Sequence, residues 1–158
     1  MEKSTFEPRD PDWERKVRES FASQKVMATL GAELLRVVPG HCEIRLPCRD
    51  ELTQQHGFIQ AGIVSAIADN AGGYAGFSLF PADSSVLTVE FKINLIAPAQ
   101  GERLLARGQV VKSGRTLTVC ALEVFALDGA GQAGDGATRK LCASGQQTLI
   151  CLHGRADV

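Results

Sequence analysis

The sequence predicts an α+β protein in which one antiparallel sheet packs against one long central helix. The first observation is a nearly uncharged segment, residues 60–79, whose apolar side chains recur at spacings of three, four and seven. The second is a series of alternating strand patterns after that segment, joined by short turns. The predicted order is a covering helix, a hairpin, the central helix and a meander of strands, all in one domain.

Residues 10–27 predict the covering helix. Asp10 suits the N-cap, and Pro11 suits the first helical position. Trp13, Val17 and Phe21 then recur at helical spacing, and we interpret Trp13 as a core anchor. We therefore divide the chain into a helical lead at residues 1–30, the main domain at 31–152 and a tail at 153–158.

Strand patterns fill most of the remaining sequence. Pro39 and Gly40 supply the turn of a first hairpin. Leu87, Phe91 and Leu95 alternate with polar residues, which predicts a strand with one buried face. The expected strands are residues 32–38, 42–47, 84–95, 103–111, 116–126 and 140–152. We expect the loop at 127–137 to be a solvated connection and the tail to be frayed.

The central helix carries one acid, Asp69, on a face that is rich in small residues. That face holds Gly62, Ser65, Asp69, Gly72, Gly73 and Gly76. Each glycine inside a helix costs about 1 kcal/mol relative to alanine, so the glycines indicate close approach of another backbone or a ligand. Asp69 is either a structural acid that bonds a neighbouring loop or a catalytic group in a cleft.

Composition and motifs exclude several functions. The net charge of −1 gives no basic surface for nucleic acid, and Asp69 argues against a helix that spans a membrane. Five cysteines without a CxxC spacing, and no apolar leader, predict a cytoplasmic protein with free thiols. Three scattered histidines predict no metal site. No Walker lysine, HExxH or dinucleotide motif is present.

An acid within a helix whose start follows a polar loop suits one type of chemistry. Backbone N–H groups near Ala61 and Gly62 would face a developing oxyanion, and Asp69 would activate water or attack directly. Such a site has no strong general acid. It therefore suits a substrate whose leaving group departs unaided, and a thiolate, with a parent pKa of about 8.5, is one. Thioesters fit better than amides.

Three segments together resemble the hot-dog-fold acyl-CoA thioesterases of the phenylacetate-degradation (PaaI-like) type. They are QQHGFIQAGIVSAIADNAGGYA, SVLTVEFKINLIAPAQG and ARGQVVKSGRTLTV, within residues 50–150. The resemblance implies a hot-dog fold and a homodimer or homotetramer whose subunits join their sheets and share active sites at the interface. It also implies Asp69 as general base or nucleophile, Thr88 as a residue that helps to hold the water, and Gln54 in place of a family asparagine.

The resemblance has one departure, at the start of the central helix. Gln60, Ala61 and Gly62 replace the His-Gly-Gly of the family. A glutamine can still donate a hydrogen bond to the thioester carbonyl, and the backbone N–H groups survive the change to alanine. His56, four residues earlier, is either a substitute for the missing imidazole or a surface group.

The resemblance also suggests where coenzyme A lies. The hairpin of Lys112, Ser113, Gly114 and Arg115 would meet the nucleotide end, although its charges also suit a solvated turn. Coenzyme A would be part of the substrate, so no separate cofactor is expected. The leading hypothesis is an acyl-CoA thioesterase that acts on an aryl or fatty acyl group. The alternatives are an acyl-CoA carrier or sensor and, with less support, a hydratase.

Overall fold

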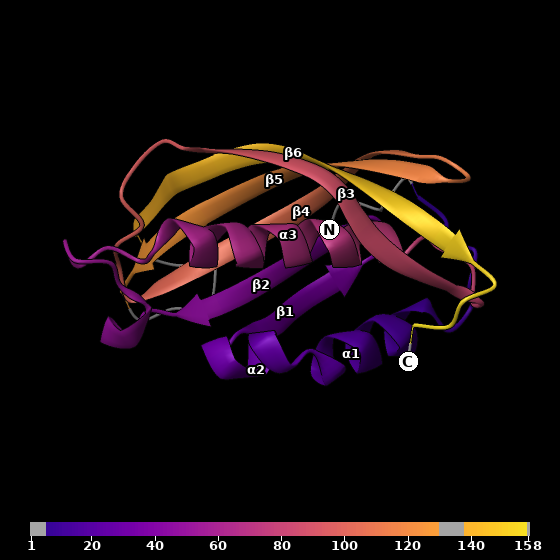
Figure 1. Ribbon diagram of the computed structural model, residues 1–158, viewed down its shortest axis with the longest axis horizontal. Helices are drawn as coiled ribbons and strands as arrows, with labels where there is room; N and C mark the ends of the chain where they lie inside the picture. Colours follow the sequence, from indigo (N-terminus) through magenta and orange to yellow (C-terminus); the bar gives the residue numbers. More distant parts are fainter. Residues whose placement is uncertain (1–5, 130–137, 158) are drawn as a thin grey trace.

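The computed structural model describes residues 6–129 and 138–157 and confirms the predicted hot-dog architecture. Its elements are α1 (Trp13–Ser23), α2 (Lys25–Leu30), β1 (Glu33–Val38), β2 (His41–Pro47), η1 (Asp50–Leu52), α3 (Ala61–Phe77), β3 (Ser84–Leu95), β4 (Arg103–Ser113), β5 (Leu117–Asp128) and β6 (Thr138–His153). The six strands form one sheet in the order β1-β2-β4-β5-β6-β3, and every neighbouring pair is antiparallel. The sheet curves around α3 (Figure 1).

The core lies between α3 and the inner face of the sheet. Ile67, Ala68 and Ala71 of α3 are fully buried, as are inward residues of the central strands such as Leu104 and Leu122. Apolar burial of this kind contributes about 25 cal/mol per Å² of surface removed from water. The helix is therefore held by the sheet, which fixes the position of every side chain on its remaining face.

The glycines of α3 explain how closely the sheet approaches the helix. A Cβ atom at Gly72 would lie 2.0 Å from Oε1 of Gln147, and one at Gly76 would lie 2.3 Å from a methyl carbon of Leu149. Both neighbours belong to β6. On the other side, a Cβ at Gly108 of β4 would lie 2.2 Å from the carbonyl oxygen of Ala71. The predicted close approach is thus confirmed at Gly72 and Gly76, whereas a Cβ at Gly73 would meet nothing within 4 Å.

The N-terminal helix differs from the prediction. It begins at Trp13 rather than near Asp10, and Gln24, in an extended conformation, separates α1 from α2. Asp10 does not cap α1. Its carboxylate instead accepts the backbone N–H of Asp12 at 2.9 Å and pairs with Lys16 at 3.1 Å. An Asp-Pro turn therefore precedes the helix, and the carboxylate is used for a tertiary contact.

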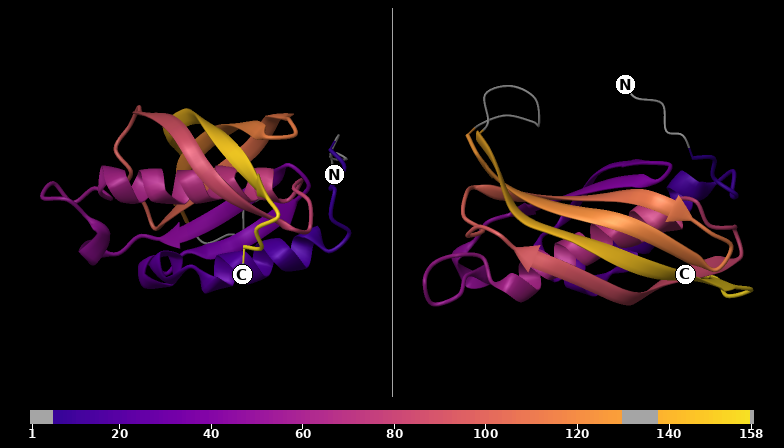
Figure 2. Two further views of the ribbon diagram at one scale, coloured as in Figure 1. Left: turned by 45° about the vertical axis from the view of Figure 1, so that its right-hand side comes forward. Right: turned by 90° about the horizontal axis from the view of Figure 1, so that it is seen from above.

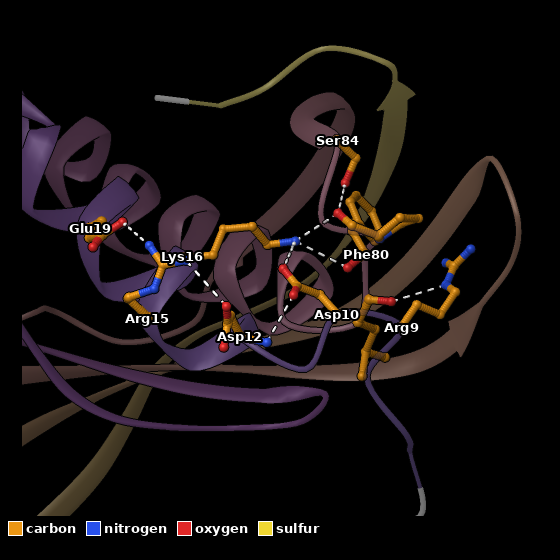
Figure 3. A network of polar contacts seen from close by, with 10 residues as sticks. Arg9, Asp10, Asp12, Arg15, Lys16, Glu19, Phe80 and Ser84 are labelled. Atoms are coloured by element: carbon orange, nitrogen blue, oxygen red, sulfur yellow. Dashed lines mark hydrogen bonds and ion pairs between the residues drawn. The ribbon is translucent and has the colours of Figure 1, made fainter.

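Lys16 anchors α1 to the C-terminal end of α3. Its ammonium group donates to the carbonyl oxygen of Phe80 at 3.1 Å (Figure 3) and to that of Pro81 at 2.8 Å. The same group lies 4.6 Å from the ring centre of Phe77. A buried charge needs such partners, because desolvation would otherwise be costly. α1 and α2 consequently lie on the side of α3 that faces away from β5 and β6 (Figure 1 and Figure 2).

Strand β3 forms one edge of the sheet. The prediction that one face of β3 is buried is wrong within a single chain. The strand pairs only with β6, and Leu87, Val89, Phe91 and Leu95 are all exposed. The apolar alternation is real, but none of the elements within residues 6–129 and 138–157 covers it. A long edge strand with an apolar face is a typical site for pairing with another strand.

The tail and the loop at residues 127–137 were predicted to be frayed and solvated, respectively. The tail is not frayed as far as residue 157, because the Arg155 N–H donates to the Asp83 carbonyl at 3.2 Å and Ser20 donates to the Asp157 carboxylate. Residues 130–137 of the predicted solvated loop lie outside the described residues. Among the residues described, no helix is long and apolar enough to cross a membrane.

Candidate active site

Asp69 lies in the middle of α3, half-buried, on the face toward β3 and β6. Its Oδ1 atom accepts a hydrogen bond from the Thr88 hydroxyl at 2.7 Å. It also accepts one from the side-chain amide of Gln147, which is only 1% exposed. The carboxylate is therefore fixed in orientation by two donors from two different strands.

Thr88 reaches Asp69 because β3 is irregular at this point. The pairing of β3 with β6 shifts register between Thr88 and Glu90, which leaves Val89 as an extra residue. Such a bulge turns a side chain toward the face it would otherwise avoid. Strict alternation would place Thr88 on the polar face of β3 with Glu90 and Lys92, and the bulge instead brings it to Asp69.

Gln147 is a site residue that the sequence analysis missed. Its Nε2 atom donates to the Asp69 carboxylate, to the Asp69 carbonyl at 3.1 Å and to the Thr88 hydroxyl at 2.9 Å. These acceptors define which end of the amide faces Asp69. One signal was present: Gln147 is polar at an inward position of β6, in phase with Gly145 and Leu149.

The start of α3 does not offer both of the expected N–H groups. Gln60 is the N-cap, and its Oε1 atom accepts the N–H groups of Gly62 at 2.6 Å and Ile63 at 3.2 Å. The expectation of an open donor at Gly62 is thus wrong for this conformation. The Ala61 N–H has no acceptor among the described residues, so Ala61 presents the free donor of the helix start.

Gln54 and Ala61 line one cavity at the start of α3, and the His56 side chain does not line it. A turn with Gly57 at φ +82° connects β2 and η1 to α3. Gln54, Phe58 and Ala61 line a cavity of about 380 Å³, which we call the helix-start cavity. The backbone N–H of His56 donates to the Gln54 side chain, and His56 itself is exposed.

Asp69 lines a different cavity, of about 370 Å³, which we call the Asp69 cavity. Asp69 follows Ala61 by eight residues, which corresponds to an axial rise of about 12 Å. A carbonyl bound at one of these positions is therefore out of reach of the other. Within one chain the structure brings Asp69 and Thr88 together, and separately Gln54 and Ala61, but it does not join the two pairs.

The predicted nucleotide-binding hairpin is also remote from the helix start of its own chain. The Arg9 guanidinium contacts both the Leu79 carbonyl, just beyond α3, and the Gly114 carbonyl. The hairpin of Lys112, Ser113, Gly114 and Arg115 consequently lies at the C-terminal end of α3. The 17 residues of α3 span about 25 Å, which separates the hairpin from Gln60.

The cysteines and potential metal ligands do not supply another site within the described residues. All five cysteines are free thiols. Burial raises the pKa of Cys120 to about 12 and that of Cys48 to about 11, so both are protonated and weakly nucleophilic near neutral pH. No group of three or more histidine, cysteine or acidic side chains gathers in the described part of the chain.

A long helix wrapped by an antiparallel sheet, with a hydrogen-bonded carboxylate in its middle, defines a protein with the hot-dog fold and a candidate site at Asp69. Residues 56–133 match the model of the thioesterase superfamily. A solved thioesterase family protein from Silicibacter pomeroyi is 48% identical, covers 90% of this chain and 99% of its own, and has a TM-score of 0.83. The chain belongs to the hot-dog thioesterase superfamily.

More distant structures support the fold alone. The PaaI protein of the Escherichia coli phenylacetic acid degradation operon is 16% identical, with a TM-score of 0.77 over 93% of this chain and 98% of its own. A Haemophilus influenzae thioesterase is 20% identical, with a TM-score of 0.71 over 85% of this chain and 87% of its own. The resemblance identified from the sequence is thus confirmed at the level of superfamily and fold.

Proposed function

We propose that this protein is an acyl-CoA thioesterase that releases a free acid and coenzyme A. The observation that carries the proposal is the half-buried Asp69 carboxylate, oriented by Thr88 and Gln147 at the edge of a cavity. A carboxylate held in this way can take a proton from water or attack the thioester carbon. The thiolate of coenzyme A then departs without a general acid.

The complete site requires two chains. The Ala61 N–H is the donor suited to a thioester oxyanion, and it lies about 12 Å along α3 from Asp69 of the same chain. Two-fold pairing of the exposed β3 edges would place two antiparallel α3 helices side by side. Each Asp69 would then face the helix start of the partner, with Gln54 beside it.

The same pairing supports the expected role of the hairpin in coenzyme A binding. Because the two α3 helices run in opposite directions, the C-terminal end of one lies near the N-terminal end of the other. The hairpin of Lys112, Ser113, Gly114 and Arg115 would therefore approach the helix start of the partner. Lys112 and Arg115 are exposed, so both cations are available to phosphate groups of coenzyme A.

Measured thiol release from aryl, short, medium and long acyl-CoAs tests the proposal. We expect release by the wild-type protein and a loss of roughly a thousandfold or more in Asp69→Asn, with an unchanged fold. Asp50→Asn, at an exposed acid in η1, is the matched control and should retain full turnover. Equal turnover of Asp69→Asn and wild type would contradict the assignment of Asp69.

A second candidate function is acyl-CoA binding without hydrolysis, as a carrier or sensor. The specific observation in its favour is the Gln60 side chain, which occupies the Gly62 N–H at the helix start. This candidate predicts micromolar acyl-CoA binding by calorimetry and no thiol release from any acyl-CoA. Rapid release in the wild type would exclude it.

A further inference from the structure

The Asp69 cavity is lined at its far end by polar side chains from four places in the chain. Ser20 comes from α1, Gln24 from the α1–α2 junction, Tyr74 from α3 and Asp157 from the tail. The helix-start cavity differs, since its lining includes Phe58, Ile59, Val64, Leu95, Ile96 and Pro98. The two cavities therefore suit different parts of a ligand.

The polar groups at the far end form one directed chain of hydrogen bonds, which we call the Tyr74 relay. Ser20 must donate to the Asp157 carboxylate, which can only accept. The Tyr74 hydroxyl must then donate to the Ser20 oxygen at 3.2 Å, and Gln24 donates its Nε2 proton to Tyr74 at 2.8 Å. Every proton along the relay points toward Asp157.

Because every proton of the relay points toward Asp157, the groups of the lining that remain for a ligand are hydrogen-bond acceptors. The Oδ1 atom of Asp157 receives no hydrogen bond from any described residue, and Asp69 contributes a second carboxylate to the lining. No lysine, arginine or histidine is among the lining residues within the described ranges. A ligand that completes the site must therefore bring a hydrogen-bond donor and no negative charge.

The distance from Asp69 to the far end of the cavity also restricts the length of the ligand. Asp69 and Tyr74 are five residues apart on α3, an axial rise of about 7.5 Å. Beyond Tyr74 the cavity is lined by Ser20 of α1 and Asp157 of the tail, which contact each other. A long alkyl chain would cover the Asp157 Oδ1 atom without giving it a donor, which costs free energy, whereas a short chain with a polar end would supply one.

We propose that the Asp69 cavity receives a short acyl group whose far end carries a hydrogen-bond donor such as a hydroxyl, and that the Tyr74 relay selects it. This inference rests on the proposed function, because it assumes that the thioester carbon lies at Asp69. A site built to bond a substrate hydroxyl discriminates strongly against the analogue that lacks it.

Three matched substrates test the inference on the chain of 158 residues. They are hexanoyl-CoA, its ω-hydroxy analogue and its ω-carboxy analogue, which have the same chain and differ at its end. We expect kcat/KM for the ω-hydroxy compound to exceed that for hexanoyl-CoA by about tenfold or more, with the ω-carboxy compound lowest. Equal values for the hydroxy and plain compounds would overturn the inference.

Two variants assign the preference to the relay. Tyr74→Phe should bring the ratio of hydroxy to plain substrate close to one, because it removes the central hydroxyl. Asp157→Asn should raise kcat/KM for the ω-carboxy compound about tenfold, because it removes a negative charge. Asp12→Asn, an exposed acid before α1, is the control and should change neither ratio. Unchanged ratios in both relay variants would contradict the assignment.

A binding measurement separates this inference from the proposed function. Calorimetric titration of the three compounds into Asp69→Asn reports the preference without hydrolysis. Absence of thiol release in the wild type would overturn the proposed function but not the acyl preference. Equal affinities of the hydroxy and plain compounds would overturn the acyl preference, whatever the hydrolysis result.

Discussion

Gln147 is the residue that most changes the description of the site. Asp69 and Thr88 could be predicted, because Asp69 is the single acid of a long apolar helix and both match the family pattern. Gln147 lies 78 residues after Asp69, and only the pairing of β6 with β3 brings it close. Sequence spacing cannot encode that contact, although an inward polar residue in a strand is a usable signal.

Replacing Gln147 tests whether it positions Asp69. In Gln147→Leu, the Asp69 carboxylate and Thr88 lose a donor, so we expect kcat to fall roughly tenfold to a hundredfold with little change in KM. The free energy of unfolding should fall by about 1–3 kcal/mol. Steady-state kinetics and urea unfolding measure the two effects.

Gln146→Leu is the control for that substitution, because Gln146 is exposed on the opposite face of the same strand. It should keep both kcat and stability near wild-type values. A Gln147→Leu protein with wild-type kcat would show that Thr88 alone orients the carboxylate.

Strand β3 shows what a single-chain pattern cannot reveal about an element. Its alternation correctly predicted a strand, but no described part of the chain buries the apolar face. The break between α1 and α2 was missed for a different reason. Helical spacing continues through Gln24 in the sequence, whereas the backbone there is extended and frees the side chain to bond Tyr74.

A charge on β3 should prevent self-association. Val89 is 54% exposed on the sheet edge, so Val89→Glu would place a carboxylate in the proposed interface. We expect a monomer by sedimentation velocity, with little thioesterase activity. Val111→Glu, at a 59% exposed valine of β4, is the matched control and should remain associated and active. A dimeric, active Val89→Glu protein would place the interface elsewhere.

Glu43 joins β2 to β4 and gives the sheet a pH-dependent contact. The His41 imidazole and the Arg107 guanidinium lower the pKa of the Glu43 carboxyl from 4.5 to about 2, against the opposing effect of burial. A lowered pKa in the folded state means that the stabilisation is present above pH 4.5. It is lost as the pH falls from there toward 2.

Glu43→Gln should therefore lower the free energy of unfolding at pH 7, and the difference from wild type should shrink as the pH falls below 4.5. Urea unfolding measures this difference in the free energy of unfolding. Both proteins are compared at one protein concentration, because the apparent stability of an associating protein depends on its concentration. Glu33→Gln removes an exposed ion pair with Arg45 and should have a small effect at every pH. A constant difference across pH would contradict the role of the Glu43 charge.

For the whole molecule, the two halves of the site lie in separate cavities of one chain. The fold could be predicted because helix, strand and turn patterns agreed with one another and with a family. The order of strands in the sheet, and hence the positions of Gln147, the hairpin and the tail, depends on long-range pairing. Association would join Asp69 of one chain to the Ala61 N–H of its partner.

Mixing two inactive variants tests this central claim most directly. One is Asp69→Asn, and the other is Ala61→Pro, which removes the free N–H. Proline suits the first helical position, and Gln60 before it is already extended at ψ 138°, so α3 should be intact.

Co-refolded or co-expressed variants would form mixed dimers in which one of the two sites has both an intact Asp69 and an intact Ala61. Random mixing of equal amounts should therefore restore about a quarter of wild-type thiol release per chain. Activity of the mixture no higher than the mean of the two separate variants would contradict a site shared between chains.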